Sequence, residues 1–409
     1  AAGSADGAIT WNEKLAMTVG GDFKIGPNAG IGITISSSGN VDAIGIITAS
    51  SFRGDGSQLT GVDSTALKDP GGNVKVQAGY GGIVVTGIAT VSSDSVINSV
   101  NIGKGANSAS GNTVLGENAL DDSVTGTNNT AIGTNVLTVL TTGADNTSVG
   151  RNSLDANTTG GNNTAMGSGA LSSNTTTHNN TAVGYVALNA NTGGSNLCAF
   201  GSGALDANST GSNNNAFGRN ALGANTTGAF NAAFGYEALA TATTVSNNSA
   251  FGHNALNANT TGSSNSAFGS GALDANTTGS NNTAMGVGAL GACTTGAGNI
   301  AIGQACLSAL TTGSDNVAVG RAVLVGTNAG RNTAIGYYAM SNNTTGSYNT
   351  ALGYTANIAN TTGNYNTAVG DQALAANTTA SNNTALGHQS LLSNTTGADN
   401  TAVGSIALD

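Results

Sequence analysis

Apolar and polar positions recur every 17 residues along residues 105–409, and each repeat centres on a glycine. One step, from Gly320 to Gly336, is 16 residues long. A fixed short period predicts identical structural units stacked in a row. The central glycines are Gly116, Gly133, Gly150, Gly167, Gly184, Gly201, Gly218, Gly235, Gly252, Gly269, Gly286, Gly303, Gly320, Gly336, Gly353, Gly370, Gly387 and Gly404, which makes 18 units.

Positions counted from the central glycine are nearly uniform. Position −1 is always apolar, and position −2 is Ala in 16 of 18 units. Position −4 is Asn in 17 of 18 units, with Leu197 as the exception, and position +4 is Leu in 16 of 18. A second turn, typically Asn-Thr-Thr-Gly, closes the unit. The expected structural residues are represented by Asn129, Gly133, Leu137, Asn163, Gly167, Leu171, Asn282, Gly286 and Leu290.

A 17-residue unit is too short for a pair of helices, which needs about 30 residues. Two short strands joined by two glycine-containing turns fit the pattern better. Each unit would then be one coil of a β-solenoid. The sequence therefore predicts an all-β, parallel β-solenoid or β-roll, with coils stacked at about 4.8 Å into a rod of roughly 85 Å.

Position +7 holds Asn in 11 of 17 units and apolar residues such as Leu140 in others. Exchange between Asn and apolar residues favours an inward site, where each Asn bonds the Asn of the next coil in a ladder. The alternative is a turn Asn that tolerates positive φ.

Neighbouring positions in each unit are both apolar: −2 with −1, and +3 with +4. Adjacent residues of a strand point to opposite faces, so we expect both strand faces to be buried. In a single solenoid, one of the two strand faces would be exposed to water. The pattern therefore predicts identical chains, intertwined or side by side, with the small Ala at the contact. It does not count the chains.

The chain divides into an irregular β-rich N-terminal or connector segment, residues 1–104, and a repeat shaft, residues 105–409. In the first segment the alternating runs 30–36 and 81–91 predict strands. Pro27 and Pro70 are expected in turns.

Charge and composition narrow the function. Only 7% of residues are charged, the net charge is −10, and residues 105–409 contain four basic residues, so nucleic-acid binding is not expected. No run of about 18 apolar residues predicts a membrane span. The printed sequence begins with Ala1 rather than Met, and no export signal is expected in its first residues.

No group of residues suggests catalysis. His178, His253 and His388 are far apart, and no metal-binding spacing is present, so neither an enzyme nor a cofactor is expected. Cys198, Cys293 and Cys306 replace Thr, Asn and Ala of the repeat and are expected as small buried residues rather than a disulfide framework.

Position +1 is the most varied, which indicates exposure. Tyr185, Tyr236, Tyr337 and Tyr354 occupy it and are candidate contacts for surface sugars. The competing interpretation is an unconstrained solvated face.

The Asn-Thr-x-apolar-Gly core resembles the head repeat of trimeric autotransporter adhesins. The segments 112–116 (NTVLG), 332–336 (NTAIG) and 366–370 (NTAVG) carry the resemblance, which covers residues 105–409. It implies left-handed parallel β-rolls packed as a homotrimer. The 17-residue coil is longer than in that family, and no coiled-coil stalk or membrane anchor is expected within residues 1–409.

Residues 45–93 resemble the N-terminal and shaft segments of tail fibres of marine phages, including those that infect cyanobacteria. That likeness implies a homotrimeric fibre on a virion, bound to other tail proteins and to a host surface glycan or protein. A repeat that stops at Asp409 without a cap suggests that a missing C-terminal tip binds the receptor. Two alternatives stay open: a trimeric adhesin on a bacterial cell surface, and an ice-binding solenoid suggested by Thr pairs such as Thr175-Thr176 and Thr260-Thr261.

Overall fold

The computed structural model describes residues 15–17, 23–25, 32–35 and 41–44 by their backbone, and residues 94–408 apart from 325 and 327. The chain forms two units, Ala1–Ile88 and Ala89–Asp409. In the first unit, β1 (Leu15–Met17), β2 (Phe23–Ile25), β3 (Gly32–Ile35) and β4 (Val41–Ile44) form an antiparallel sheet in that order. The strand predicted at 30–36 is therefore confirmed as β3. The prediction for 81–91 and those for Pro27 and Pro70 lie outside the described residues.

The second unit begins with a hairpin and one short 3₁₀ helix, and then repeats a single strand. Its elements are β5 (Ser95–Ile97), β6 (Val100–Gly103), η2 (Ala106–Ser108), β7 (Thr113–Gly116), β8 (Thr130–Ile132), β9 (Thr147–Val149), β10 (Thr164–Met166), β11 (Thr181–Val183), β12 (Cys198–Phe200), β13 (Asn215–Phe217), β14 (Ala232–Phe234), β15 (Ser249–Phe251), β16 (Ser266–Phe268), β17 (Thr283–Met285), β18 (Ile300–Ile302), β19 (Val317–Val319), β20 (Thr333–Ile335), β21 (Thr350–Leu352), β22 (Thr367–Val369), β23 (Thr384–Leu386) and β24 (Thr401–Val403).

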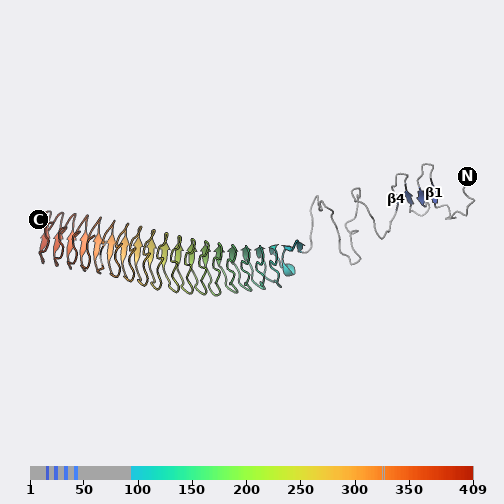
Figure 1. The fold of residues 1–409 in the computed structure, drawn as a ribbon, viewed down its shortest axis with the longest axis horizontal. Helices are drawn as coiled ribbons and strands as arrows, with labels where there is room; N and C mark the ends of the chain where they lie inside the picture. The colour runs from blue at the N-terminus through green and yellow to red at the C-terminus, as the bar shows by residue number, and fades with distance from the viewer. Residues whose placement is uncertain are drawn as a thin grey trace, which may run out of the picture. The chain divides into compact units, whose positions relative to one another are not determined.

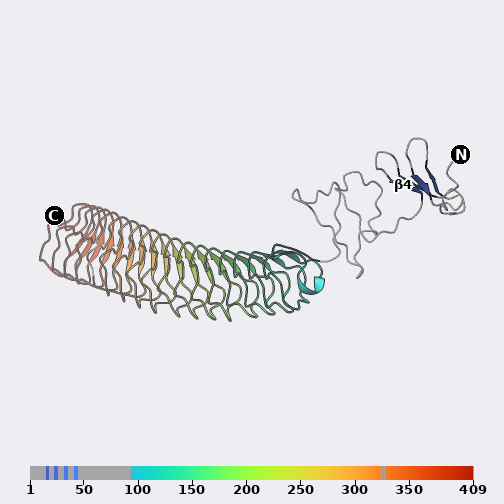
Figure 2. The same ribbon diagram turned by 45° about the vertical axis from the view of Figure 1, so that its right-hand side comes forward.

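The strands β7 to β24 are parallel and pair in register, so Ala165 lies beside Ala182 and Ala182 beside Ala199. Every coil returns the chain to the same point one strand spacing further on, which makes the second unit a rod with one sheet along its side (Figures 1 and 2). The predicted parallel β-solenoid is confirmed. The prediction of two strands per coil is wrong, because each described coil has one strand, of four residues in β7 and three in β8 to β24, and turns elsewhere.

The first coil is covered at its open edge. β6 pairs antiparallel with both β5 and β7, so the hairpin occupies the edge that the first parallel strand would otherwise present. Exposed strand edges invite pairing with other chains, and solenoids use terminal caps to prevent it. The hairpin therefore acts as the N-terminal cap of the rod.

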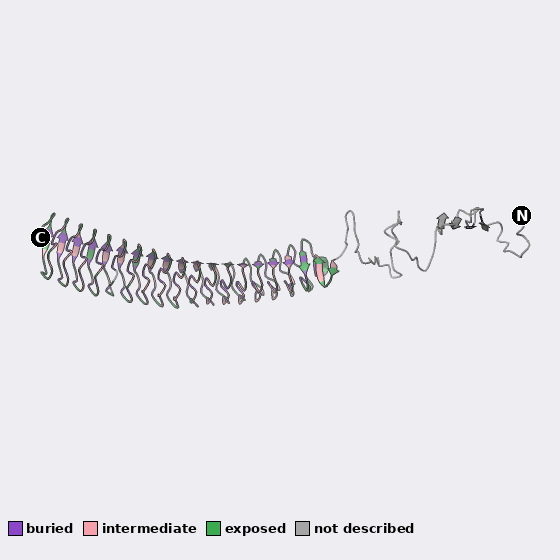
Figure 3. Ribbon diagram, turned by 45° about the horizontal axis from the view of Figure 1, so that its top comes forward, coloured by how far each residue is buried: buried purple, intermediate pink, exposed green. Residues whose placement is uncertain are grey.

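The core is a narrow stack of small and branched side chains inside the coils. Ala165 at position −2, Ala170 at +3 and Leu171 at +4 are all fully buried, and the same positions are buried in coil after coil (Figure 3). Two adjacent residues can both point inward at +3 and +4 because position +4 lies in a turn. Its residues have φ between 47° and 56°, a left-handed conformation that side chains rarely adopt.

The arrangement of the strand corrects one prediction. Ala at −2 points inward, whereas the large apolar residue at −1 points outward and stays partly exposed, as Met166 does at 44%. The small residue was expected at a contact with another chain, but it lines the interior instead. Alternation explains the outcome, because a three-residue strand has its middle residue on one face and its two ends on the other.

The central glycines are required by both conformation and space. From Gly133 to Gly404 their φ lies between 129° and 144°. A Cβ at Gly252 would lie 2.4 Å from the carbonyl oxygen of Gly269 in the next coil. Coils can therefore stack at strand spacing only if this position has no side chain.

Candidate functional site

The outer face of the sheet carries a continuous column of apolar side chains at position −1, each of them half-buried or exposed. Leu115, Met285 and Leu386 are 45%, 44% and 46% exposed. Five phenylalanines in successive coils stack ring on ring, with centroids 4.6–4.9 Å apart and interplanar angles of 5–8°. They are Phe200, Phe217, Phe234, Phe251 and Phe268. Exposed apolar surface of this extent is typical of an interaction site.

Position −3 forms a parallel column on the same face, two residues from position −1. It holds Thr in 11 of 18 coils and otherwise Ser, Ala, Asn, Cys, Ile or Val. Neither column contains a charged residue, although the chain carries a net charge of −10. We call these two columns, residues −3 and −1 of every coil, the sheet stripe.

A first asparagine ladder runs through the interior at position −4, where Asn129, Asn163 and Asn282 were expected. Asn282 donates through its backbone amide to Oδ1 of Asn265 at 3.0 Å and through Nδ2 at 3.2 Å. Its own Nδ2 reaches across the coil to the carbonyl oxygen of Gly296 at 2.8 Å. All three predicted residues are fully buried, so each coil is tied to its neighbour by polar groups that water does not reach.

A second ladder runs through position +7 and confirms the buried alternative. Asn208 donates through Nδ2 to Oδ1 of Asn191 at 3.1 Å, and Asn225 does the same to Asn208 at 2.9 Å. No Asn at +7 in the described coils has positive φ; the positive-φ asparagines of these coils lie at −5 and +2, apart from Asn357 at +4. Both ladders meet at one acceptor per coil: the carbonyl oxygen of Gly279 receives bonds from Asn265 and Asn276.

The tyrosines predicted as surface contacts all lie exposed at position +1, but the structure does not gather them into one site. Tyr185 is 62% exposed. Tyr236 stacks on His253 at 5.3 Å and bonds Arg219 at 3.1 Å. Tyr337 and Tyr354 stack at 5.7 Å. These groups lie on different coils along the rod.

Sequence reasoning missed a second exposed polar and aromatic column, at position −5. Asp315, Arg331, Tyr348 and Tyr365 follow one another there in successive coils, and Tyr348 stacks on Tyr365 at 4.9 Å. The 16-residue step between Gly320 and Gly336 was the available signal, because it interrupts the repeat beside these residues.

The described residues contain no group of three or more His, Cys, Asp or Glu side chains suited to a metal ion. His178 accepts a bond from the amide of Gly161 through Nδ1 at 2.8 Å, and His388 lies 3.8 Å from Asp371. Burial raises the pKa of the carboxyl of Asp206 and of Asp274, each on a different coil. The two histidine contacts link neighbouring coils, and they do not bring together a nucleophile, a base and an orienting group.

The reactivity of the buried cysteines Cys293 and Cys306 tests whether these side chains lie in the core. Burial raises the pKa of the Cys293 thiol to about 11 and that of Cys306 to about 12. Because the thiolate is the nucleophile, we expect neither to react with iodoacetamide in the folded protein at pH ~8. Mass spectrometry of labelled peptides should find both modified only after unfolding in guanidinium; modification of either in the native rod would contradict the buried placement.

Cys198, expected to be buried, is instead only half-buried because it lies on the sheet stripe.

No helix among the described residues has the length and apolarity needed to cross a membrane. No family model, no curated protein and no solved structure matches the chain. What the geometry establishes is therefore its architecture: the chain contains a parallel β-solenoid built from 17-residue coils.

Proposed function

We propose that this chain is the shaft of an elongated, homotrimeric fibre of a phage tail that mediates attachment to the host cell. The observation that supports it is the column at position −1 of the sheet stripe, which is apolar in every coil, runs along one side of the rod and is partly exposed to solvent in the single chain. The apolar side chains at −2, +3 and +4 are buried inside the coils, whereas the side chains at −1 point away from that core.

The size and chemistry of the sheet stripe favour a copy of the same chain as its partner. Two columns of 18 residues give 36 positions, and a stable interface uses about 20–30 residues from each partner. Identical chains with a net charge of −10 repel one another, yet no charge lies on the stripe itself. A copy also repeats the same axial spacing, so side chains match along the whole length. The number three rests on the resemblance to trimeric autotransporter heads.

The phage assignment rests on the resemblance of residues 45–93 to tail-fibre segments. In this proposal the protein lies outside the cell on the virion, binds other tail proteins at one end, and has a structural rather than an enzymatic role. A host glycan or protein would be recognised through a C-terminal tip. A trimeric adhesin on a bacterial surface would use the same stripe, and location of the protein on purified virions by immunogold labelling would separate the two.

A triple variant in which Phe200, Phe234 and Phe268 are replaced with Asp tests self-association through the sheet stripe. We expect native mass spectrometry to show three chains in the wild type and one in the variant, with the far-ultraviolet circular dichroism of the rod unchanged. Tyr185→Asp, which also charges an exposed aromatic residue but away from the stripe, should stay trimeric. Iodoacetamide labelling of Cys198 should rise in the triple variant, because assembly would cover it. A wild-type chain that is monomeric at all concentrations would refute the proposal.

One observation favours a second candidate, the ice-binding solenoid. From Thr333 to Thr401 the stripe shows Thr in five successive coils, each beside an aliphatic residue. The pair Thr260-Thr261 contributes less, because the hydroxyl of Thr260 is engaged with the next coil, where it donates to the carbonyl of Thr277 at 2.9 Å. Thermal hysteresis measured on the monomeric variant and on the wild type would decide between ice binding and self-association.

A further inference from the structure

The coil from Gly320 to Gly336 is one residue shorter than all the others. The residue is lost from the Asn-Thr-Thr-Gly turn, where this coil has Asn328 followed by Ala329. In regular coils the backbone carbonyl of the first Thr accepts from the coil before it, as Thr158 does from the amide of Thr141 at 2.9 Å. Here the side chain of Asn328 takes over: its Oδ1 accepts from the amide of Thr311 at 2.9 Å and from its hydroxyl at 2.7 Å. The stacking is preserved although the turn is shorter.

The shortened turn leaves a hollow of about 290 Å³ on the surface of the rod. Gly330 enlarges it. At the equivalent position −6, Ser280 and Ser314 place hydroxyls against the backbone amides of Ser263 and Ala297, each at 3.0 Å. Gly330 offers no hydroxyl to Ser314. We call this hollow the short-coil notch; its polar and aromatic lining includes Thr312, Asp315, Asn328, Arg331, Ser347 and Tyr348.

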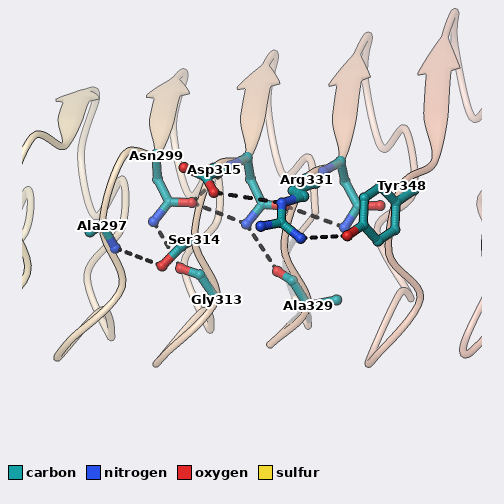
Figure 4. A network of polar contacts seen from close by, with 10 residues as sticks. Ala297, Asn299, Gly313, Ser314, Asp315, Ala329, Arg331 and Tyr348 are labelled. Carbon is teal, nitrogen blue, oxygen red and sulfur yellow. Dashed lines mark hydrogen bonds and ion pairs between the residues drawn. The ribbon is translucent and has the colours of Figure 1, made fainter.

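Three side chains from three successive coils form the wall of the short-coil notch (Figure 4). Arg331 lies between the other two: its Nε is 3.9 Å from the carboxylate of Asp315, and its Nη1 donates to the hydroxyl of Tyr348. The guanidinium also lies 5.4 Å from the centroid of the Tyr348 ring. Tyr348 and Tyr365 remain 44% and 58% exposed. Charged donors and acceptors, hydroxyls and aromatic surface therefore converge on one concave place.

We propose that the short-coil notch binds a neutral saccharide. A carboxylate and a guanidinium held side by side can accept from and donate to adjacent sugar hydroxyls, and a tyrosine offers an apolar surface to the sugar ring. The volume suits one sugar unit, since pockets for larger ligands begin at about 300 Å³. The Arg331–Asp315 pair balances its own charge, and the chain carries −10 overall, so an anionic sugar gains no net attraction. This site goes beyond the proposed fibre, because it lies on the side of the shaft and not at a tip.

Saturation-transfer NMR on the full chain tests the site with methyl glycosides of glucose, galactose, mannose and glucuronic acid. We expect transfer to at least one neutral glycoside, weaker transfer to the glucuronide, and loss of the signal in Arg331→Met. Inserting Thr between Asn328 and Ala329 restores the 17-residue coil and should also abolish it, because the added residue fills the notch.

Arg219→Met is the matched control. Arg219 also lies over a tyrosine, with its guanidinium 5.6 Å from the ring of Tyr236, but on a regular 17-residue coil. This variant should bind the sugar as the wild type does. Absence of transfer from all neutral glycosides, retained binding in the insertion variant, equal loss in both arginine variants, or stronger binding of the glucuronide would each overturn the proposal. Sugar binding by the monomeric Phe→Asp variant reports on the notch separately from self-association.

Discussion

Gly252→Ala is expected to destabilise the middle of the rod by about 3 kcal/mol or more. The new Cβ would lie 2.4 Å from the carbonyl oxygen of Gly269, and the backbone has φ of 144°, where alanine is strained. The coils on either side cannot separate without breaking both asparagine ladders. Hydrogen exchange read by mass spectrometry should show faster exchange in peptides covering residues 235–286 and little change near the ends.

Gly288→Ala is the matched control for this substitution. Gly288 also has positive φ, 64°, but a Cβ there meets nothing within 4 Å. Ala305 and Ala322 already occupy the equivalent position with φ of 52° and 55°. We expect a loss of only about 1 kcal/mol. Equal effects of the two substitutions would show that steric contact between coils does not select glycine at the centre of the repeat.

Asn265→Asp is expected to cost about 3 kcal/mol or more at pH 7. Asn265 is fully buried, and its Nδ2 donates to the carbonyl oxygen of Gly279 at 2.9 Å. An ionised carboxylate would place an acceptor against that acceptor. Its other oxygen would still accept from the amide of Asn282, so the packing is preserved and the loss is electrostatic.

The pH dependence of this loss follows from the sign of the pKa change. Burial beside a carbonyl raises the pKa of the introduced carboxyl above its unfolded value of about 4. The penalty is therefore small below the unfolded pKa and grows as the pH rises through the folded pKa. Urea unfolding of variant and wild type between pH ~4 and ~8 should show the difference widening with pH. Asn247→Asp, at an exposed position where Asp145, Asp315 and Asp399 already occur, should show no such trend; a flat profile for Asn265→Asp would contradict the buried ladder.

The period and the fixed columns were enough to predict the solenoid. Gly133, Asn129 and Leu137 each recur in register, and the structure gives each a role in stacking: a close approach, a ladder and a core residue. The exchange of Asn with Leu140 and Cys293 at +7 correctly indicated an inward ladder, because only a buried site accepts both.

Which side chains point into the coil and which point outward could be predicted less accurately than the solenoid itself. The apolar pattern predicts Val136 and Leu137 as strand neighbours on opposite faces, but Leu137 has φ of 52° and both side chains are buried. Leucine seldom adopts this conformation, so nothing in its identity signals the turn. The same assumption put Ala131 at a contact between chains, whereas it is Ile132 that faces outward.

Because each coil advances the rod by one strand spacing, the number of coils sets the length of the rod. Removing or duplicating a complete 17-residue segment would shift the far end by about 4.8 Å and leave every remaining hydrogen bond with an equivalent partner. In-frame recombination between near-identical stretches of the gene can thus lengthen or shorten the protein without redesigning it. Mutation can in this way change the distance between the two ends of the rod in steps of one coil, and the new length is inherited.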